Sequence, residues 1–149
     1  MKKTALALFA ASLGLLTACH EQSSPTTQEP TAAAGPQCYA HTSATDTVRL
    51  TLQATQPTLT GQLTYHYFEK DRNQGTISGT MHGDTLLADY TFQSEGTTSV
   101  RQVAFLRRDI GFIEGFGPVV ERQGKTVFEK PHALTFDAKY TLLPVACPR

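Results

Sequence analysis

Tryptophan is absent from this chain of 149 residues, and methionine and cysteine are rare, with two and three copies. Neither sign of charge is in excess either, because Lys and Arg together number 13, as do Asp and Glu. A nucleic-acid-binding protein usually carries a basic stripe on its surface. The charge balance therefore predicts that nucleic acid is not the partner.

The sequence also lacks the common motifs of enzymes and metal sites. It contains no Gly-x-Ser-x-Gly, His-Glu-x-x-His or Cys-x-x-Cys, and its glycines include no lysine-bearing phosphate loop. His66 and His82 share a face of two expected neighbouring strands, but the expected register separates them by about 13 Å, too far for one metal ion. We therefore expect a protein without catalytic activity, metal or cofactor, and an enzyme of unrecognised type is the remote alternative.

The first twenty residues have a characteristic order. Met1-Lys2-Lys3 is followed by an apolar run over residues 5–16, which is too short to cross a bilayer, and then by Leu16-Thr17-Ala18-Cys19. This order resembles the signal peptide and lipobox of bacterial lipoproteins, in which the cysteine receives a diacylglyceryl group and usually an acylated amino terminus. The resemblance implies that residues 1–18 are a signal peptide and that Cys19 is the lipidated membrane anchor.

Residues 19–36 are rich in Ser, Thr, Gln, Pro and Ala and show no apolar periodicity. Such a segment buries too little surface to offset its conformational entropy, so we expect a flexible tether before a domain over residues 37–149. Two or three acyl chains would hold the protein stably to a membrane of the cell envelope. In many lipoproteins an aspartate after the cysteine causes retention in the inner membrane, so His20 favours the outer membrane; the leaflet stays open.

Cys38 and Cys147 lie near the two ends of the expected domain. In an oxidising envelope we expect them to form a disulfide that ties the first strand to the last, with two free thiols as the alternative. Closing a loop of this length would stabilise the fold by about 4–5 kcal/mol if the effect is one of chain entropy.

Most of the domain consists of short segments in which apolar and polar residues alternate, the pattern of half-buried strands. No stretch shows a long period of 3.6, so helix is limited to a turn or two. The segments are separated by turn residues every eight to twelve positions. The expected strands cover residues 38–41, 46–54, 59–67, 76–82, 85–92, 100–107, 110–117, 119–120, 125–128, 134–136 and 140–145.

The turns allow a register to be predicted. A hairpin centred on Arg72 and a second on Gly83-Asp84 produce the cross-strand row Leu63–Met81–Leu86, and the neighbouring rows are also apolar or small. Gly83 supplies the positive φ of a tight hairpin turn. Because a slip of one residue would mix the two faces, the consistent rows support this pairing.

Eight to ten sequential antiparallel strands predict an all-β fold, namely a single up-and-down barrel, with a β-sandwich as the alternative. The pattern is similar to the calycin-type barrels of many small envelope lipoproteins, although the lipocalin Gly-x-Trp signature is missing. Residues 69–76 and 94–96 also resemble segments of small envelope lipoproteins with no assigned activity.

The inward face of the expected barrel carries aromatic rings and two opposite charges. Extending the register places Arg101 and Glu114 diagonally on this face, where we expect them to pair because a lone buried charge is costly. They form either a structural pair near an open end or a contact to the polar head of a ligand. The aromatic wall of a ligand site would consist of Tyr65, Tyr67, Tyr90, Phe92 and Phe112.

The first functional hypothesis is a lipoprotein that binds a small apolar ligand within its barrel. An eight-stranded barrel is just wide enough for its own side chains or for one small ligand. The alternative is a protein-binding module, such as an inhibitor of an envelope hydrolase, that docks through the charged loop 69–75; this loop is otherwise a solvated hairpin tip that discourages edge pairing. The docking candidates are Glu69, Asp71, Arg72 and Asn73.

Overall fold

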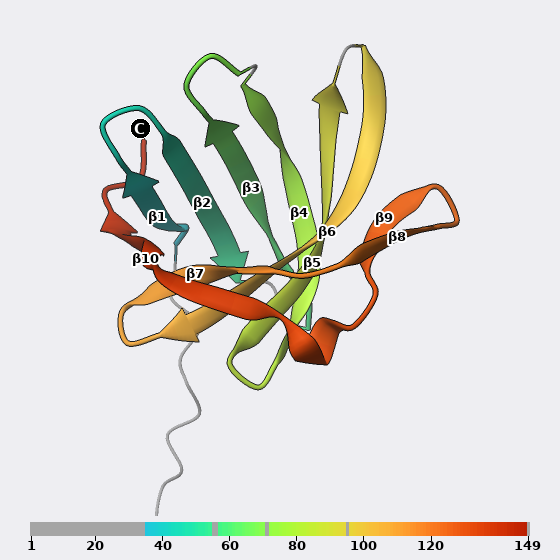
Figure 1. Ribbon diagram of the computed structural model, residues 1–149. Helices are drawn as coiled ribbons and strands as arrows, with labels where there is room; N and C mark the ends of the chain where they lie inside the picture. The colour runs from blue at the N-terminus through green and yellow to red at the C-terminus, as the bar shows by residue number, and fades with distance from the viewer. Residues whose placement is uncertain (1–34, 55–56, 71, 95, 149) are drawn as a thin grey trace, which may run out of the picture. The chain divides into compact units, whose positions relative to one another are not determined.

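The computed structural model describes residues 35–54, 57–70, 72–94 and 96–148 (Figure 1). Cys19, the signal peptide and nearly all of the tether lie outside these ranges, so their assignment stays a prediction. Within the described ranges no helix has the length and apolar character needed to cross a bilayer. The elements are β1 Gln37–Thr42, β2 Thr47–Ala54, β3 Leu59–His66, β4 Asn73–His82, β5 Thr85–Ser94, β6 Thr97–Arg108, β7 Gly111–Phe116, β8 Val119–Arg122, β9 Lys125–Phe128, the 3₁₀ turn η1 Pro131–Ala133 and β10 Thr135–Val145.

Eight of these strands close into an antiparallel barrel. Each strand from β1 to β7 pairs with the next, and β10 joins β7 back to β1 (Figure 1). The β8–β9 hairpin lies outside this ring and meets β6 at the parallel pair Arg101↔Thr126. The prediction of a single all-β barrel is confirmed, and the alternative sandwich is wrong because β5 and β6 are paired and β10 leaves no open edge.

The first hairpin has a different register from the one expected. Leu63 lies opposite Gly75, six positions from the expected partner Met81, whereas the Met81↔Leu86 pair of the next hairpin is confirmed. A Cβ atom at Gly75 would lie 2.0 Å from the carbonyl oxygen of Thr91, so this glycine permits close strand approach within β4. The last three of the seven residues in the expected loop 69–75 are therefore strand. The inward faces survive because the shift is an even number of residues.

The next two hairpins are each displaced by two residues. Tyr90 lies opposite Arg101 instead of Val103, and Phe105 lies opposite Glu114 instead of Phe112. Between β5 and β6 the turn is shorter than expected, because the polar segment expected to be a loop continues the strands as far as the pair Ser94↔Thr97. Between β6 and β7 the turn lies at Asp109-Ile110, enclosed by the pair Arg108↔Gly111, one residue later than expected. Even displacements again leave each side chain on its expected face.

β10 is one strand where the sequence predicts two. Its pairing with β7 is irregular between Phe136 and Thr141, which marks a bulge of the kind that bends a strand at a barrel rim. Within this bulge the Asp137 carboxylate accepts a hydrogen bond from the backbone N–H of Lys139 at 3.1 Å. The bulge interrupts the alternation that would otherwise reveal a continuous strand.

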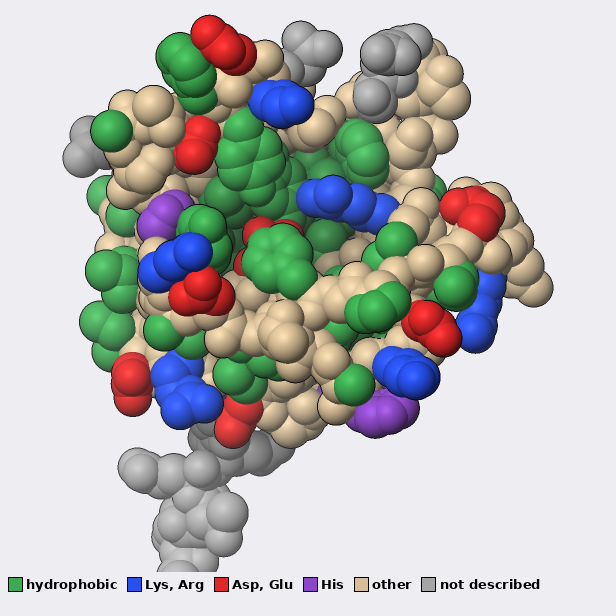
Figure 2. Space-filling model, in the orientation of Figure 1, with side chains coloured by type: hydrophobic (Ala, Val, Ile, Leu, Met, Phe, Trp, Pro, Cys, Tyr) green, Lys and Arg blue, Asp and Glu red, His purple; other side chains and the backbone are tan. Residues whose placement is uncertain are grey.

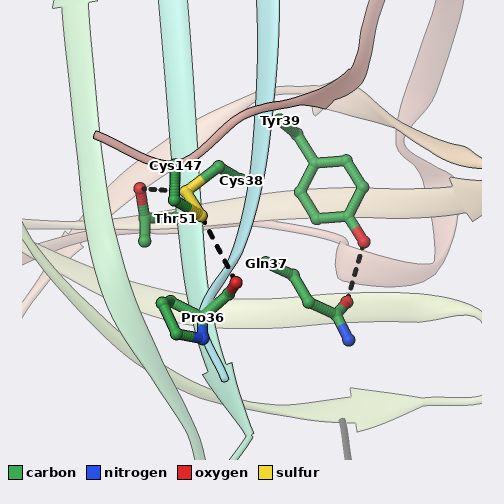
Figure 3. The surroundings of a disulfide bond; sticks show 6 residues. All are labelled: Pro36, Gln37, Cys38, Tyr39, Thr51 and Cys147. Carbon is green, nitrogen blue, oxygen red and sulfur yellow. Dashed lines mark hydrogen bonds between the residues drawn. A yellow bond between two sulfur atoms is a disulfide. The ribbon is translucent and has the colours of Figure 1, made fainter. Parts of the chain in front are cut away.

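The predicted disulfide joins Cys38 of β1 to Cys147, just after β10, with 5.2 Å between their Cα atoms (Figure 3). The Thr51 hydroxyl lies 3.5 Å from Cys38 Sγ, and the Pro36 carbonyl oxygen lies 3.3 Å from Cys147 Sγ. The pairing predicted from the sequence is thus confirmed. It fastens together the two strands whose pairing closes the barrel.

The barrel interior contains one continuous cluster of buried side chains. Leu50, Leu63, Leu86 and Phe105 are fully buried and fill one part of it. The remaining members are Val48, Leu52, Tyr65, Ile77, Ala88, Tyr90, Val103, Phe112 and Leu142. Much of the interior is therefore occupied by the chain itself, and any ligand site must lie in the part that is not filled.

Candidate functional site

Four of the five predicted wall residues form a contiguous aromatic group inside the barrel. The Tyr65 ring lies 5.8 Å from the Tyr67 ring and 5.8 Å from the Tyr90 ring, and Tyr90 stacks on Phe92 at 4.7 Å. Phe112 is separate, because its ring packs edge-on against Tyr39 in the filled part of the core. A role in ligand binding stays a prediction for all five.

Arg101 is held by this aromatic group. Its guanidinium carbon lies 5.0 Å from the ring centre of Tyr65, 5.5 Å from that of Tyr90 and 5.8 Å from that of Phe92. Such contacts stabilise a cation through the negative faces of the rings. Its Nε atom is buried and has no hydrogen-bond partner among the described residues.

The predicted Arg101–Glu114 ion pair is absent from the described residues, where the ion pairs within 4.0 Å are all exposed. Glu114 is only 7% exposed, and its Oε1 atom accepts a hydrogen bond of 2.5 Å from the Tyr65 hydroxyl. β3 and β7, which carry these residues, occupy opposite positions in the ring, so the bond crosses the barrel. The partner of Glu114 is thus Tyr65, and not Arg101 as predicted from the sequence.

Burial determines the protonation behaviour of these groups. It raises the pKa of Glu114 above its usual value, while the Tyr65 hydrogen bond and the Arg101 charge lower it in part. Burial likewise raises the pKa of both Tyr67 and Tyr90 to about 12. The two phenols are therefore neutral donors at physiological pH. Within the described part of the chain the Tyr90 hydroxyl is buried without a hydrogen-bond partner.

An open pocket with a volume of about 320 Å³ lies beside Glu114. Figure 2 shows a hollow lined by hydrophobic side chains, with acidic atoms at its depth. The walls come from β1, the β1–β2 turn, β2, the residue that follows β3, β7 and β10. They are formed by His41, Ser43, Asp46, Val48, Tyr67, Glu114, Phe116, Tyr140 and Leu142.

The rim of this pocket is tied by local hydrogen bonds. The Ser43 hydroxyl accepts the backbone N–H of Asp46 at 3.0 Å, which fixes the β1–β2 turn. The Asp46 Oδ1 atom in turn accepts the backbone N–H of Phe68 at 2.9 Å, which links this turn to the segment after β3. These two hydrogen bonds therefore hold the carboxylate of Asp46 at the rim of the pocket.

Sequence reasoning did not find His41, Ser43, Asp46 or Tyr140. These residues reach the pocket because β10 closes the barrel on β1, and because the bulge in β10 changes the direction of the Tyr140 side chain. Both features depend on the pairing of strands that are distant in the sequence. The only local signal is the alternation of His41 with Tyr39, which places His41 on the inner face.

The predicted docking loop has a smaller extent than expected. Glu69 adopts a positive φ of 53° in the turn, Arg72 is exposed, and Asn73 is the first residue of β4 rather than part of the loop. Asp71 lies outside the described residues. Docking through this loop stays a prediction.

Within the described ranges no three His, Cys, Asp or Glu residues are grouped so as to hold a metal ion. The chain matches no protein-family model, no curated protein and no solved structure.

Proposed function

We propose that this protein is a lipid-anchored lipoprotein of the cell envelope whose barrel binds one small, largely apolar ligand and performs no chemistry on it. The observation that carries the proposal is the pocket of about 320 Å³ beside Glu114. Ligand sites are typically concave and mostly apolar, with a few polar groups that fix orientation, and begin at about 300 Å³.

The polar groups next to the pocket support the same proposal. In folded proteins buried polar atoms are nearly always hydrogen-bonded, to protein, water or ligand. Among the residues that the structure describes, Tyr90 Oη and Arg101 Nε are exceptions. They belong to the same aromatic group as Tyr67, which lines the pocket. A ligand or ordered water that reaches this group would supply the missing partners.

The test uses protein lacking residues 1–19, which retains every strand of the barrel. Titration with the neutral fluorophore N-phenyl-1-naphthylamine should give a saturable increase in emission, read without interference because tryptophan is absent. Val48→Phe adds a ring to the pocket wall and should weaken binding by about tenfold or more, whereas Val145→Phe, at an exposed position, should not. Absence of saturable binding, or equal affinity in both variants, would remove the ligand site.

Native mass spectrometry of the same protein provides an independent check. A ligand acquired during expression would appear as an added mass that is lost in Val48→Phe and kept in Val145→Phe.

The anchor is tested separately by metabolic labelling of the full chain with an alkyne-bearing fatty acid. Cys19→Ser should abolish the label, because Cys19 would be the acceptor. Cys147→Ser is the matched control and should retain it, since Cys147 is engaged in the disulfide with Cys38. A labelled Cys19→Ser protein would contradict the anchor assignment.

A further inference from the structure

We infer that the polar end of the ligand is an organic cation, such as a primary or quaternary ammonium group, held between Glu114, Asp46 and the aromatic rings of the pocket. The inference rests on the proposed function and specifies the charge of the ligand. It follows from which charges line the pocket, which of their atoms are free, and what surrounds them.

The pocket wall contains two carboxylates and neither Lys nor Arg. Among the described residues Glu114 has one hydrogen-bond donor, the Tyr65 hydroxyl, which binds Oε1 and leaves Oε2 without a partner. Asp46 uses Oδ1 to accept the N–H of Phe68 and leaves Oδ2. One carboxylate oxygen of each residue is therefore available to a ligand that donates hydrogen bonds or carries positive charge.

Three aromatic rings complete the wall. Tyr67, Phe116 and Tyr140 line the pocket and keep 39%, 49% and 45% of their surface exposed. Aromatic faces that converge with acidic groups are the usual means by which proteins bind ammonium ligands. Tyr140 already accepts a cation on its ring, since Lys139 Nζ lies 4.7 Å from the ring centre. The edge of His41 packs against the same ring at 5.7 Å and limits its orientation.

The nearby positive charge of Arg101 does not reverse this preference. Its guanidinium lies over Tyr65, Tyr90 and Phe92 and is not part of the pocket wall. An anionic ligand in the pocket would add a negative charge beside Glu114 and Asp46, which like-charge repulsion disfavours. Affinity should therefore decrease from cationic to neutral to anionic ligands.

Three ligands with one apolar skeleton test the order: phenylpropyltrimethylammonium, 3-phenylpropan-1-ol and 4-phenylbutyrate. Their affinities are measured by displacement of N-phenyl-1-naphthylamine from protein lacking residues 1–19. The cation should bind about tenfold more tightly than the alcohol, and the carboxylate should bind most weakly.

Isosteric variants identify the groups responsible. Glu114→Gln and Asp46→Asn should each reduce the advantage of the cation over the alcohol by about threefold or more, because each removes one lining charge. Asp84→Asn is the matched control, since its exposed carboxylate pairs with Arg107 and does not line the pocket. It should leave the advantage unchanged.

The inference is overturned if the alcohol binds as tightly as the cation, if the carboxylate binds most tightly, or if Asp46→Asn and Asp84→Asn behave alike. Asp46 lies at the rim outside the hydrophobic core, so its variant keeps the test valid if Glu114→Gln does not fold. If one of these three overturning results is obtained while N-phenyl-1-naphthylamine still binds, the inference fails and the proposed function is unaffected. If neither the fluorophore nor any of the three ligands binds, the proposed function is overturned, and the inference with it.

Discussion

The two parts of the barrel interior are built by the same strands but differ in chemistry. β3 contributes Leu63 to the filled part and Tyr65 to the part beside the pocket, and β6 contributes Phe105 and Arg101 in the same way. The filled part is wholly apolar and excludes solvent. The other part holds a buried carboxyl, unpartnered polar atoms and a pocket.

This difference separates what stabilises the barrel from what it can bind. Burial of apolar surface is the main favourable contribution to folding, whereas burial of a charge opposes it unless the charge is well paired. Within the ranges that the structure describes, Glu114 has only the Tyr65 hydroxyl as a donor, and Arg101 Nε has no partner. A chain selected only for stability would gain from apolar residues at these positions, so their presence favours a binding role.

The largest expected effect belongs to the filled part. Phe105→Ala should lower the free energy of unfolding by about 3–5 kcal/mol, because it leaves a cavity in a fully buried region. Urea unfolding followed by circular dichroism measures the change. The fluorophore should still bind below the transition, since Phe105 does not line the pocket. A loss below about 1 kcal/mol would contradict the close packing assigned to this part.

Two tyrosine variants, each lacking one hydroxyl oxygen, compare the contributions of the Tyr65 and Tyr90 hydroxyl groups to stability. Tyr65→Phe should cost about 1–3 kcal/mol, because the buried carboxyl of Glu114 loses its donor. Tyr90→Phe should change stability by less than about 0.5 kcal/mol or increase it slightly, because the Tyr90 hydroxyl has no partner among the described residues. The same urea assay applies. Equal costs would show that the Tyr65–Glu114 bond is not the determining contact.

Arg101→Met should alter stability by about 1 kcal/mol or less, since three ring contacts are lost while an unpaired buried group is removed. A loss of several kcal/mol would revive the direct Arg101–Glu114 pair predicted from the sequence. Lys125→Met, which breaks an exposed ion pair with Asp89, is the control for a change of charge alone.

The smallest expected effect is a change in the pH dependence of the free energy of unfolding. The folded-state pKa of Glu114 is raised, so between the unfolded and folded pKa values the native protein binds more protons than the unfolded chain. The contribution of Glu114 to stability is therefore fully present below its pKa in the unfolded state. It is lost as the pH rises through its pKa in the folded state. Urea unfolding from pH 4 to pH 7 should show a flatter decline in Glu114→Gln than in the wild type. Parallel curves would mean that Glu114 is not held in a desolvated site.

The alternation of apolar and polar residues was enough to predict the inward faces and the barrel. Leu63, Tyr90 and Phe105 all lie on their expected face although their cross-strand partners differ from those predicted. The reason is that each register shift is even, and the side-chain period of a strand is two. The β4–β5 register was predictable from the tight turn at Gly83-Asp84, whereas the registers of the other three predicted hairpins were not. At Gly96, for example, a tight turn shortens a connection that reads as a polar loop.

The site was predictable only in part for a similar reason. Arg101 and Glu114 were correctly placed inside the barrel, but the hydrogen-bond partner of Glu114 is Tyr65 from the opposite strand. Asp46 and Tyr140 meet across the closure of β10 on β1, which no local pattern encodes. Residues brought together by ring closure require the three-dimensional structure.

The most direct test of the account is a methyl NMR titration of the protein with N-phenyl-1-naphthylamine. Val48 and Leu142 line the pocket, whereas Leu52 and Leu86 lie in the core away from it. We expect large chemical-shift changes for the methyl groups of Val48 and Leu142 and small changes for those of Leu52 and Leu86. Shifts of equal size in both pairs, or no shifts at all, would contradict a barrel that is filled in one part and open to a ligand in the other.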